Sequence, residues 1–276
     1  MATARRRESA YEKYPWRLGN LQWLRAQRQL WKGQKLRLPY LEFLGDTGDS
    51  MYRLLKPHLP DDSFFVGMDI DPVTLVKHVF RDAPFELILA DGYEAIPRLL
   101  RGGRRFGAVN LDTTEGVRPR WWSDRTESVR AIVELATQGG HSFALVLNHT
   151  LDRGSEKGTT VAQRLEMHAD ALAEAFGAWR LKKETLLRGS EGFASGVQKL
   201  GYGGGFEVYR SAPHRKCPSC SWEETSAVAS TEELILCPTC SKALPQRLRM
   251  LTVRLAFDGV RRTCAVQTRP ASARVM

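Results

Sequence analysis

The chain has 276 residues, of which 42% are hydrophobic and 26% charged, an ordinary globular composition. This composition excludes wholesale disorder and collagen-like or mucin-like chains. The formal net charge is +10, from 41 lysines and arginines against 31 aspartates and glutamates, and an excess of this size favours a polyanionic partner.

The positive charge is unevenly distributed along the chain. Residues 1–38 carry 10 basic and 2 acidic side chains, residues 39–210 carry 21 and 24, and residues 211–276 carry 10 and 5. A slightly acidic middle therefore lies between two basic flanks. No apolar run approaches the ~20 residues that cross a bilayer, and no apolar segment follows the first arginines. The sequence predicts a cytoplasmic protein without a membrane segment.

Residues 8–32 are predicted to be helical, and we assign residues 1–37 to a basic N-terminal helical segment. Two interpretations remain open: an amphipathic helix packed on the following domain, or a helix whose basic face contacts nucleic acid. The apolar residues that recur at roughly helical spacing are Tyr14, Leu18, Leu21, Trp23, Leu24, Leu30 and Trp31.

Residues 38–210 alternate short apolar runs with helical stretches, which predicts a doubly wound, mostly parallel α/β sheet. The runs are rich in Val, Leu, Ile and Phe, as in strands that are buried on both faces. The predicted strands are Tyr40–Leu44, Phe64–Met68, Phe85–Leu89, Phe106–Leu111, Ser142–Leu147 and Phe206–Arg210. The predicted helices are Ser50–His58, Pro72–Phe80, Tyr93–Leu100, Glu127–Thr137 and Val161–Phe176.

Acidic side chains mark the first three strands of this domain. Ligands of open α/β sheets bind at the carboxyl ends of the strands, where an acidic side chain can accept hydrogen bonds from ribose hydroxyls. We therefore expect a nucleotide-type cofactor there, although Asp69 and Asp91 could instead cap the following helices and Glu42 could be an exposed strand acid. The candidate cofactor residues are Glu42, Gly45, Asp46, Gly48, Asp69 and Asp91.

This succession resembles the class I S-adenosylmethionine-dependent methyltransferases over roughly residues 38–150. In that family an acid of the first strand precedes a glycine-rich turn, the second strand ends in a ribose-binding acid, and the third ends in an Asp near the adenine. The resemblance implies these roles for Glu42 with the Gly45–Gly48 turn, for Asp69 and for Asp91, and it implies S-adenosylmethionine as the cofactor.

The resemblance also implies that the catalytic motif lies at the end of the fourth strand, here Asn110-Leu111-Asp112. Methyl transfer from a sulfonium is an in-line displacement, so the enzyme mainly aligns the acceptor and handles one proton. Asp112 is the candidate for holding or deprotonating an acceptor amine, and Asn110 for binding its edge. A helix or turn cap is the alternative role of Asp112.

Two arginines and two tryptophans follow in a predicted loop. They could hold phosphates and stack a base of a nucleic-acid substrate, or one tryptophan could fill the edge of the core. These candidate substrate-binding residues are Arg118, Arg120, Trp121 and Trp122.

The last segment, residues 211–276, contains two Cys-Pro-x-Cys motifs. Cys217, Cys220, Cys237 and Cys240 give the spacing C-x2-C-x16-C-x2-C, which lies in the range of zinc sites and resembles a zinc ribbon. An iron site of rubredoxin type and redox dithiols are the alternatives. We assign this segment to a zinc-ribbon domain with a basic tail and a hairpin turning at Asp258–Gly259.

Together these features predict an S-adenosylmethionine-dependent methyltransferase that acts on nucleic acid, RNA or DNA, at a base nitrogen. A protein partner could bind through the zinc ribbon. The alternative is a non-catalytic zinc-ribbon protein, for nucleic-acid binding or assembly, on a degenerate methyltransferase fold. Leu44 and Asp46 support the alternative, because they stand where the family usually has glycines.

Overall fold

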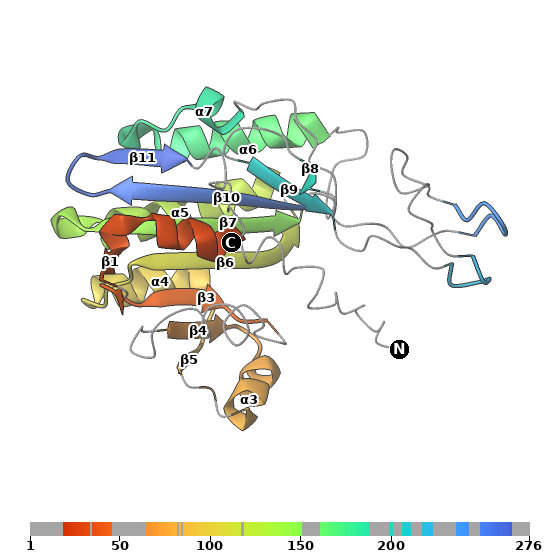
Figure 1. Ribbon diagram of the computed structural model, residues 1–276, viewed down its shortest axis with the longest axis horizontal. Coiled ribbons are helices and arrows are strands. Elements are labelled where there is room, and N and C mark those ends of the chain that lie inside the picture. Colours follow the sequence, from red (N-terminus) through yellow and green to blue (C-terminus); the bar gives the residue numbers. More distant parts are fainter. Residues whose placement is uncertain are drawn as a thin grey trace.

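The computed structural model of the chain is built around a twisted sheet flanked by helices (Figure 1). No helix in the described part of the chain has the length and hydropathy that crossing a membrane requires. The structure describes residues 19–33, 35–45, 65–81, 83, 85–116, 119–150, 161–187, 199–200, 206–210, 217–222, 236–242 and 249–266.

Five strands run parallel in the order β5-β4-β3-β6-β7, and β10 follows β7 in antiparallel orientation. β9 is antiparallel to β10, and β8 and β11 pair with β9 and β10. We call the end of the sheet at which the five parallel strands finish the carboxyl edge, and the opposite end the amino edge. The strands are β3 (Tyr40–Phe43), β4 (Phe65–Asp69), β5 (Glu86–Leu89), β6 (Ala108–Gly116), β7 (Ser142–Thr150), β8 (Lys199–Leu200), β9 (Phe206–Arg210), β10 (Arg249–Asp258) and β11 (Thr263–Val266).

This arrangement confirms the predicted fold class, a doubly wound, mostly parallel α/β sheet. Successive side chains of a strand point to opposite faces. Val109 and Leu111 of β6 therefore join the core under α4, α5 and α6, whereas Ala108 faces the other core. That second core is covered by the N-terminal helix and by Leu75 of α3.

α3, α4 and α6 agree with the predicted helices within one residue at each end, whereas α5 starts early and α7 was not predicted. Helix α5 begins at Pro119, eight residues before the predicted Glu127, because proline suits the first helical position, where its missing N–H is not needed. The predicted helix Ser50–His58 lies outside the described residues. The helices are α3 (Pro72–Phe80), α4 (Gly92–Arg101), α5 (Pro119–Ala136), α6 (Val161–Ala175), α7 (Lys183–Leu187) and the 3-10 turns η1 (Arg28–Leu30), η3 (Gln138–Gly140) and η4 (Gly177–Trp179).

The N-terminal helix is a structural layer of the domain. Residues 19–26 are helical, and Leu21, Trp23 and Leu24 are each only 2% exposed in the second core. At one end of the layer, Arg254 of β10 donates a 2.7 Å hydrogen bond to Asn20. The packed interpretation is therefore supported for the described part of the helix. The predicted helix ends too late, since η1 and a small hairpin of β1 (Trp31–Lys32) and β2 (Lys35–Leu36) follow residue 26.

The sheet continues beyond the domain boundary predicted at residue 210. β10 pairs with β7 over nine residues, from Met250–Thr150 to Asp258–Ser142, and it also pairs with β9. The expected hairpin at Asp258–Gly259 is present as the turn between β10 and β11, but it belongs to the sheet. The cysteine-bearing segment is thus an insertion between two neighbouring strands, residues 211–248.

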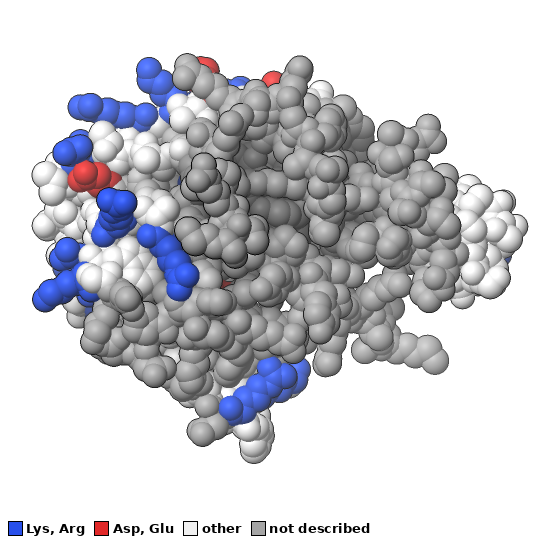
Figure 2. Space-filling view, in the orientation of Figure 1, with Lys and Arg blue, Asp and Glu red and all other residues white. Residues whose placement is uncertain are grey.

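The two edges of the sheet differ in charge. Figure 2 shows Lys and Arg side chains gathered over the end of the molecule that carries β1 and the β10–β11 turn, which is the amino edge. The carboxyl edge carries Asp69, Asp71 and Asp91, at the ends of β4 and β5.

Replacing Trp23 by alanine should lower the free energy of unfolding by about 3–5 kcal/mol, because a large buried side chain is lost from the second core. Urea unfolding followed by circular dichroism measures the change. Gln22→Ala, on the exposed side of the same helix, is the matched control and should change stability by less than about 0.5 kcal/mol. Equal effects of the two variants would contradict the packed helix.

Candidate active site and cysteine cluster

The turn that follows β3 is held from two sides at the carboxyl edge. The backbone N–H of Gly45 donates to Oδ2 of Asp69 at 3.1 Å, and the carbonyl oxygen of Gly45 lies 2.9 Å from Nε2 of His78 on α3. His78 is buried. Gly45 has φ +58°, a left-handed conformation that favours glycine. One peptide of the candidate cofactor turn is therefore fixed by groups from β4 and α3.

Asp69 serves this turn and does not cap a helix. Its second oxygen, Oδ1, accepts from the N–H of Asp71 at 2.9 Å, whereas Asp71 itself caps α3 by accepting from Val73. Partial burial raises the pKa of Asp69, and the N–H groups of Asp71 and Gly45 oppose this by stabilising the carboxylate. Each oxygen still has lone-pair capacity for a further donor such as a ribose hydroxyl.

Leu44, which replaces a glycine of the family turn, is accommodated below the turn. Its side chain is buried in the second core and lies against Gly67 of β4. A Cβ at Gly67 would lie 2.4 Å from the Leu44 Cδ1 atom, so the missing side chain at Gly67 makes room for Leu44. Asp46 and Gly48, the other candidates in this turn, lie outside the described residues.

Asp91 is the N-cap of α4, as its alternative interpretation proposed. Its Oδ1 accepts from the N–H of Tyr93 at 2.9 Å, and its Oδ2 lies 3.5 Å from the guanidinium of Arg125 on α5. The same guanidinium lies over the Tyr93 ring, 4.7 Å from the centroid. The cap uses only Oδ1 of Asp91, and Oδ2 lies beside Arg125 at the carboxyl edge. Asp91 can therefore cap α4 and still contact a cofactor.

Glu42 is only 3% exposed, which rules out an exposed strand acid. The Tyr40 hydroxyl donates to its Oε2 at 2.8 Å. Burial, and then the adjacent Glu42 carboxylate, raises the pKa of Tyr40 well above its usual value. Glu42 therefore lies within the sheet below the turn.

A buried polar row crosses the sheet near Glu42. The Thr252 hydroxyl of β10 donates to Asn148 of β7 at 2.7 Å, and the Asn148 amide nitrogen donates to Asn110 of β6 at 2.6 Å. Asn110 is next to Glu42 in register. All these groups are buried, so the row holds the Asn110 side chain in one orientation; its contact with an acceptor stays a prediction.

Asp112 lies two residues further along β6, opposite Asn148 in register. It does not cap a helix, because β6 continues to Gly116 instead of ending at the predicted Leu111. Its Oδ1 atom is buried and has no hydrogen-bond partner within the described part of the chain. An orphaned carboxylate oxygen of this kind is suited to receive a donor from a ligand.

The substrate-binding candidates lie at the start of α5 and not in a loop. Arg120, Trp121 and Trp122 belong to the first turn of this helix, and Arg118 lies outside the described residues. Their proposed contacts with phosphates and bases stay a prediction.

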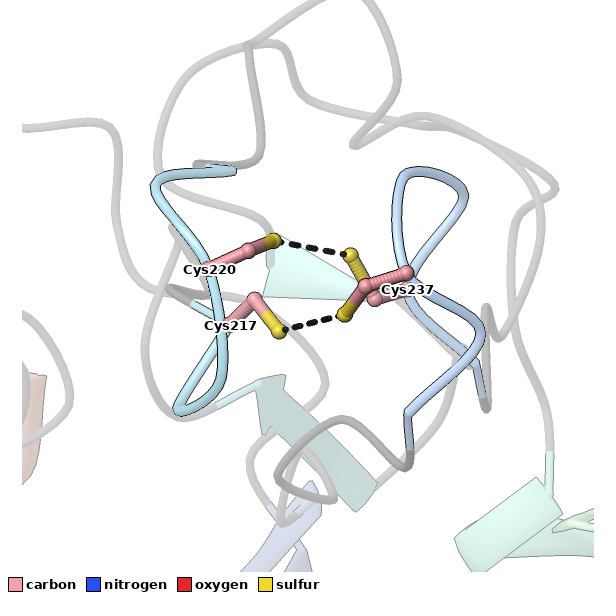
Figure 3. Close-up of side chains that lie close together, drawn as sticks. Cys217, Cys220 and Cys237 are labelled. Carbon is pink, nitrogen blue, oxygen red and sulfur yellow. Dashed lines mark hydrogen bonds between the residues drawn. The ribbon is translucent and has the colours of Figure 1, made fainter.

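The four cysteines converge as the spacing predicted (Figure 3). All four sulfur atoms lie within 4.8 Å of one another, with 3.5 Å between Cys217 and Cys240 and 3.6 Å between Cys220 and Cys237. Tetrahedral zinc with Zn–S bonds of about 2.3 Å requires sulfur separations of about 3.8 Å. The four thiolates therefore form a donor set that fits zinc.

Each cysteine pair lies on a tight turn closed by backbone hydrogen bonds. The N–H of Cys217 donates to Trp222, and that of Cys237 donates to Lys242. Ser241 has φ +54°, which explains why glycine is common at this place in such turns. Although burial opposes it, hydrogen bonds from backbone N–H groups and neighbouring thiols lower the pKa of Cys237 to about 7.

The insertion that carries these cysteines starts and ends at the carboxyl edge. Arg210, the last residue of β9, pairs with Arg249, the first of β10. Met250 in turn pairs with Thr150, which ends β7 and pairs with Gly116, the end of β6. The base of the insertion is thus on the edge that carries Asp69, Asp91 and the end of β6.

Sequence patterns missed several residues of the site. His78 and Thr252 contact groups 33 and 104 residues away. Tyr40 begins a predicted strand, and Asn148 directly follows the predicted strand Ser142–Leu147, which in the structure continues to Thr150. The apolar run from Leu251 to Phe257 was the available signal for β10, and a polar residue within such a run, here Thr252, requires a partner.

No family model and no curated protein sequence matches the chain. Among solved structures, NSun6 of Pyrococcus horikoshii has a TM-score of 0.39 at 14% identity, over 82% of this chain and 49% of its own. An S-adenosylmethionine-dependent methyltransferase of Agrobacterium tumefaciens has 0.44 at 15%, over 87% and 61%. A precorrin-6y C5,15-methyltransferase of Geobacter metallireducens has 0.38 at 12%, over 93% and 92%. The chain therefore spans about half the length of NSun6.

Purified protein should contain about one zinc ion per chain, and Cys237→Ser should lose it, because a four-cysteine site with one thiolate removed is incomplete. Elemental analysis by mass spectrometry measures the content. Cys264→Ser is the matched control, since the fifth cysteine lies on β11, and it should keep the metal. Zinc affinity should fall as the pH drops, because protons compete with the metal for the thiolates. Metal-free, folded wild type would contradict the site.

Proposed function

We propose that the chain is an S-adenosylmethionine-dependent methyltransferase that modifies a nucleic acid at a base nitrogen. The observation that carries the proposal is the arrangement at the carboxyl edge. A glycine turn held by Asp69 and His78 lies beside β6, on which the buried Asp112 oxygen lacks a partner among the described residues.

The residues at the edge fit the cofactor. Asp69 has acceptor capacity for ribose hydroxyls beyond its two backbone donors, and Asp91 stands at the end of the next strand with one oxygen beside Arg125. The left-handed Gly45 leaves the turn without a side chain where a ligand approaches. When bound, S-adenosylmethionine supplies an electrophilic methyl group on its sulfonium.

Asp112 is the group proposed to hold the acceptor amine and to take its proton. Its Oδ1 is free of partners among the described residues. The neighbouring Asn148 is oriented by Thr252 and Asn110, which keeps the Asp112 surroundings in one arrangement. A fixed carboxylate is suited to the single proton that methylation of an amine releases.

A nucleic-acid substrate is supported by the net charge of +10 and by the place of the insertion. Its base lies at the same edge as Asp112, where a substrate must be presented. Basic residues flank both cysteine pairs in the sequence, namely Arg215, Lys216 and Lys242. RNA and DNA both fit these features, and the cytoplasmic location stays a prediction from the sequence.

Asp69→Asn should weaken binding of S-adenosylmethionine about tenfold or more, because one carboxylate oxygen that accepts charge-assisted hydrogen bonds becomes a donor. Titration calorimetry on zinc-loaded protein measures the affinity. Glu94→Gln removes the same charge from an exposed position at the start of α4 and should change it less than twofold. Wild type that is folded but does not bind the cofactor would instead support the non-catalytic alternative.

Asp112→Asn should slow methyl transfer about 10²–10⁴-fold, the usual contribution of a positioned general base. Its affinity for S-adenosylmethionine should stay within about twofold of wild type. Transfer is measured with tritiated cofactor on mixed cellular RNA and DNA, with nuclease digestion to identify the labelled polymer. Undiminished transfer by the variant would remove Asp112 from the reaction.

A further inference from the structure

Five exposed cations lie at the amino edge, at the end of the sheet away from the candidate active site. They come from two segments at that end (Figure 1), the η1–β1–β2 segment before β3 and the β10–β11 turn. We call them the amino-edge surface; they are Arg28, Lys32, Arg37, Arg261 and Arg262.

The β10–β11 turn holds its two arginines on a rigid base. Asp258 Oδ1 accepts from the N–H groups of Val260 and Arg261 at 3.0 and 3.1 Å. Gly259 packs so closely on the backbone after α5 that an added Cβ would lie 2.4 Å from the carbonyl oxygen of His141. The other oxygen of Asp258, Oδ2, lies 3.8 Å from Nε of Arg261, and Arg261 and Arg262 are both exposed.

The N-terminal part of the surface is equally well anchored. Leu30 is buried in the second core, and its carbonyl oxygen accepts from the N–H of Arg37 at 2.9 Å. Nε of Arg37 donates to the carbonyl oxygen of Trp31 at 2.9 Å. η1 lies against β7, whose first residue pairs with Asp258. Figure 1 shows β1 and the β10–β11 turn at the same end of the sheet.

The cysteine insertion does not provide a comparable positive charge. Residues 211–248 contain four basic and four acidic side chains, so their net charge is zero. The +5 of residues 211–276 instead comes from β10, the β10–β11 turn and the tail. Arg254 contributes nothing to the exposed charge because it is buried against Asn20. In Figure 2 the described cations accordingly gather at the end opposite the cysteine turns.

We propose that the amino-edge surface binds the phosphate backbone of a nucleic acid. Adjacent arginines on a rigid turn suit phosphates, because the guanidinium fork binds phosphate oxygens in pairs and a fixed base reduces the entropy lost on binding. Each phosphate that one of these exposed cations neutralises releases a condensed counterion, which favours binding and makes it depend on salt.

The inference deepens the proposed function and rests on it for one point, that the bound polymer is the substrate. β10 spans the sheet with ten residues, or roughly 30 Å at about 3.3 Å per residue. A polymer that reaches both edges must therefore extend about nine base pairs, or be folded to that size. The surface would hold the substrate far from the transferred methyl group.

Two double variants test the surface. Arg28→Gln with Lys32→Gln removes charge from the N-terminal part, and Arg261→Gln with Arg262→Asn removes it from the turn; asparagine tolerates the positive φ of Arg262. Arg130→Gln with Lys183→Gln removes the same charge from α5 and α7 and is the control. The probe is a 30-base-pair duplex of mixed sequence, titrated by fluorescence anisotropy from 50 to 200 mM salt.

Each surface variant should bind the duplex about tenfold more weakly and reduce the slope of log affinity against log salt by about 1–2, whereas the control stays near wild type. Surface variants that behave like the control would overturn the proposal. Polyglutamate that competes as well as the duplex at equal charge would overturn the assignment to phosphates. Cofactor affinity, measured in parallel, separates the two hypotheses. Wild type that binds the duplex but not S-adenosylmethionine would contradict the proposed function and would still support the nucleic-acid-binding surface.

Discussion

Burial of the central strands on both faces is the constraint that organises this molecule. A strand covered by helices on each side must be almost entirely apolar, since a buried polar group without a partner is costly. Charged side chains are thereby disfavoured inside the sheet, and Glu42 and Arg254, which are buried there, each have a hydrogen-bonding partner. Asp69 and Asp91 lie where β4 and β5 finish, and the exposed arginines of the β10–β11 turn lie at the opposite end of the sheet.

The polar residues that do lie inside the sheet depend on one another. Glu42 accepts from Tyr40, Asn110 accepts from Asn148, and Asn148 accepts from Thr252. Since β10 supplies Thr252, this strand also orients Asn148, the neighbour of Asp112. The arrangement at the carboxyl edge therefore depends on a strand that follows the cysteine insertion in the sequence.

How far the sequence predicts the structure depends on the range of each interaction. The strands, α3 and the four cysteines could be predicted because periodicity and spacing are local properties. The place of β10 could not, because pairing with β7 joins residues about a hundred positions apart. The contact of His78 with the turn could not be predicted for the same reason, since its partner Gly45 is 33 residues away. The early start of α5 was missed because arginines and tryptophans suggested a loop, although Pro119 is a signal of a helix start.

The position of the insertion has a consequence for how the sheet closes during folding. Pairing of Arg210 with Arg249 must close a loop of 38 residues, and the entropy lost rises with the logarithm of loop length. Once a metal joins Cys217 to Cys240, the flexible path shortens to about 16 residues, which reduces the closure penalty by about 0.8 kcal/mol. Metal availability would thus bear on the kinetics with which β10 finds its neighbours, as well as on the stability of the insertion itself.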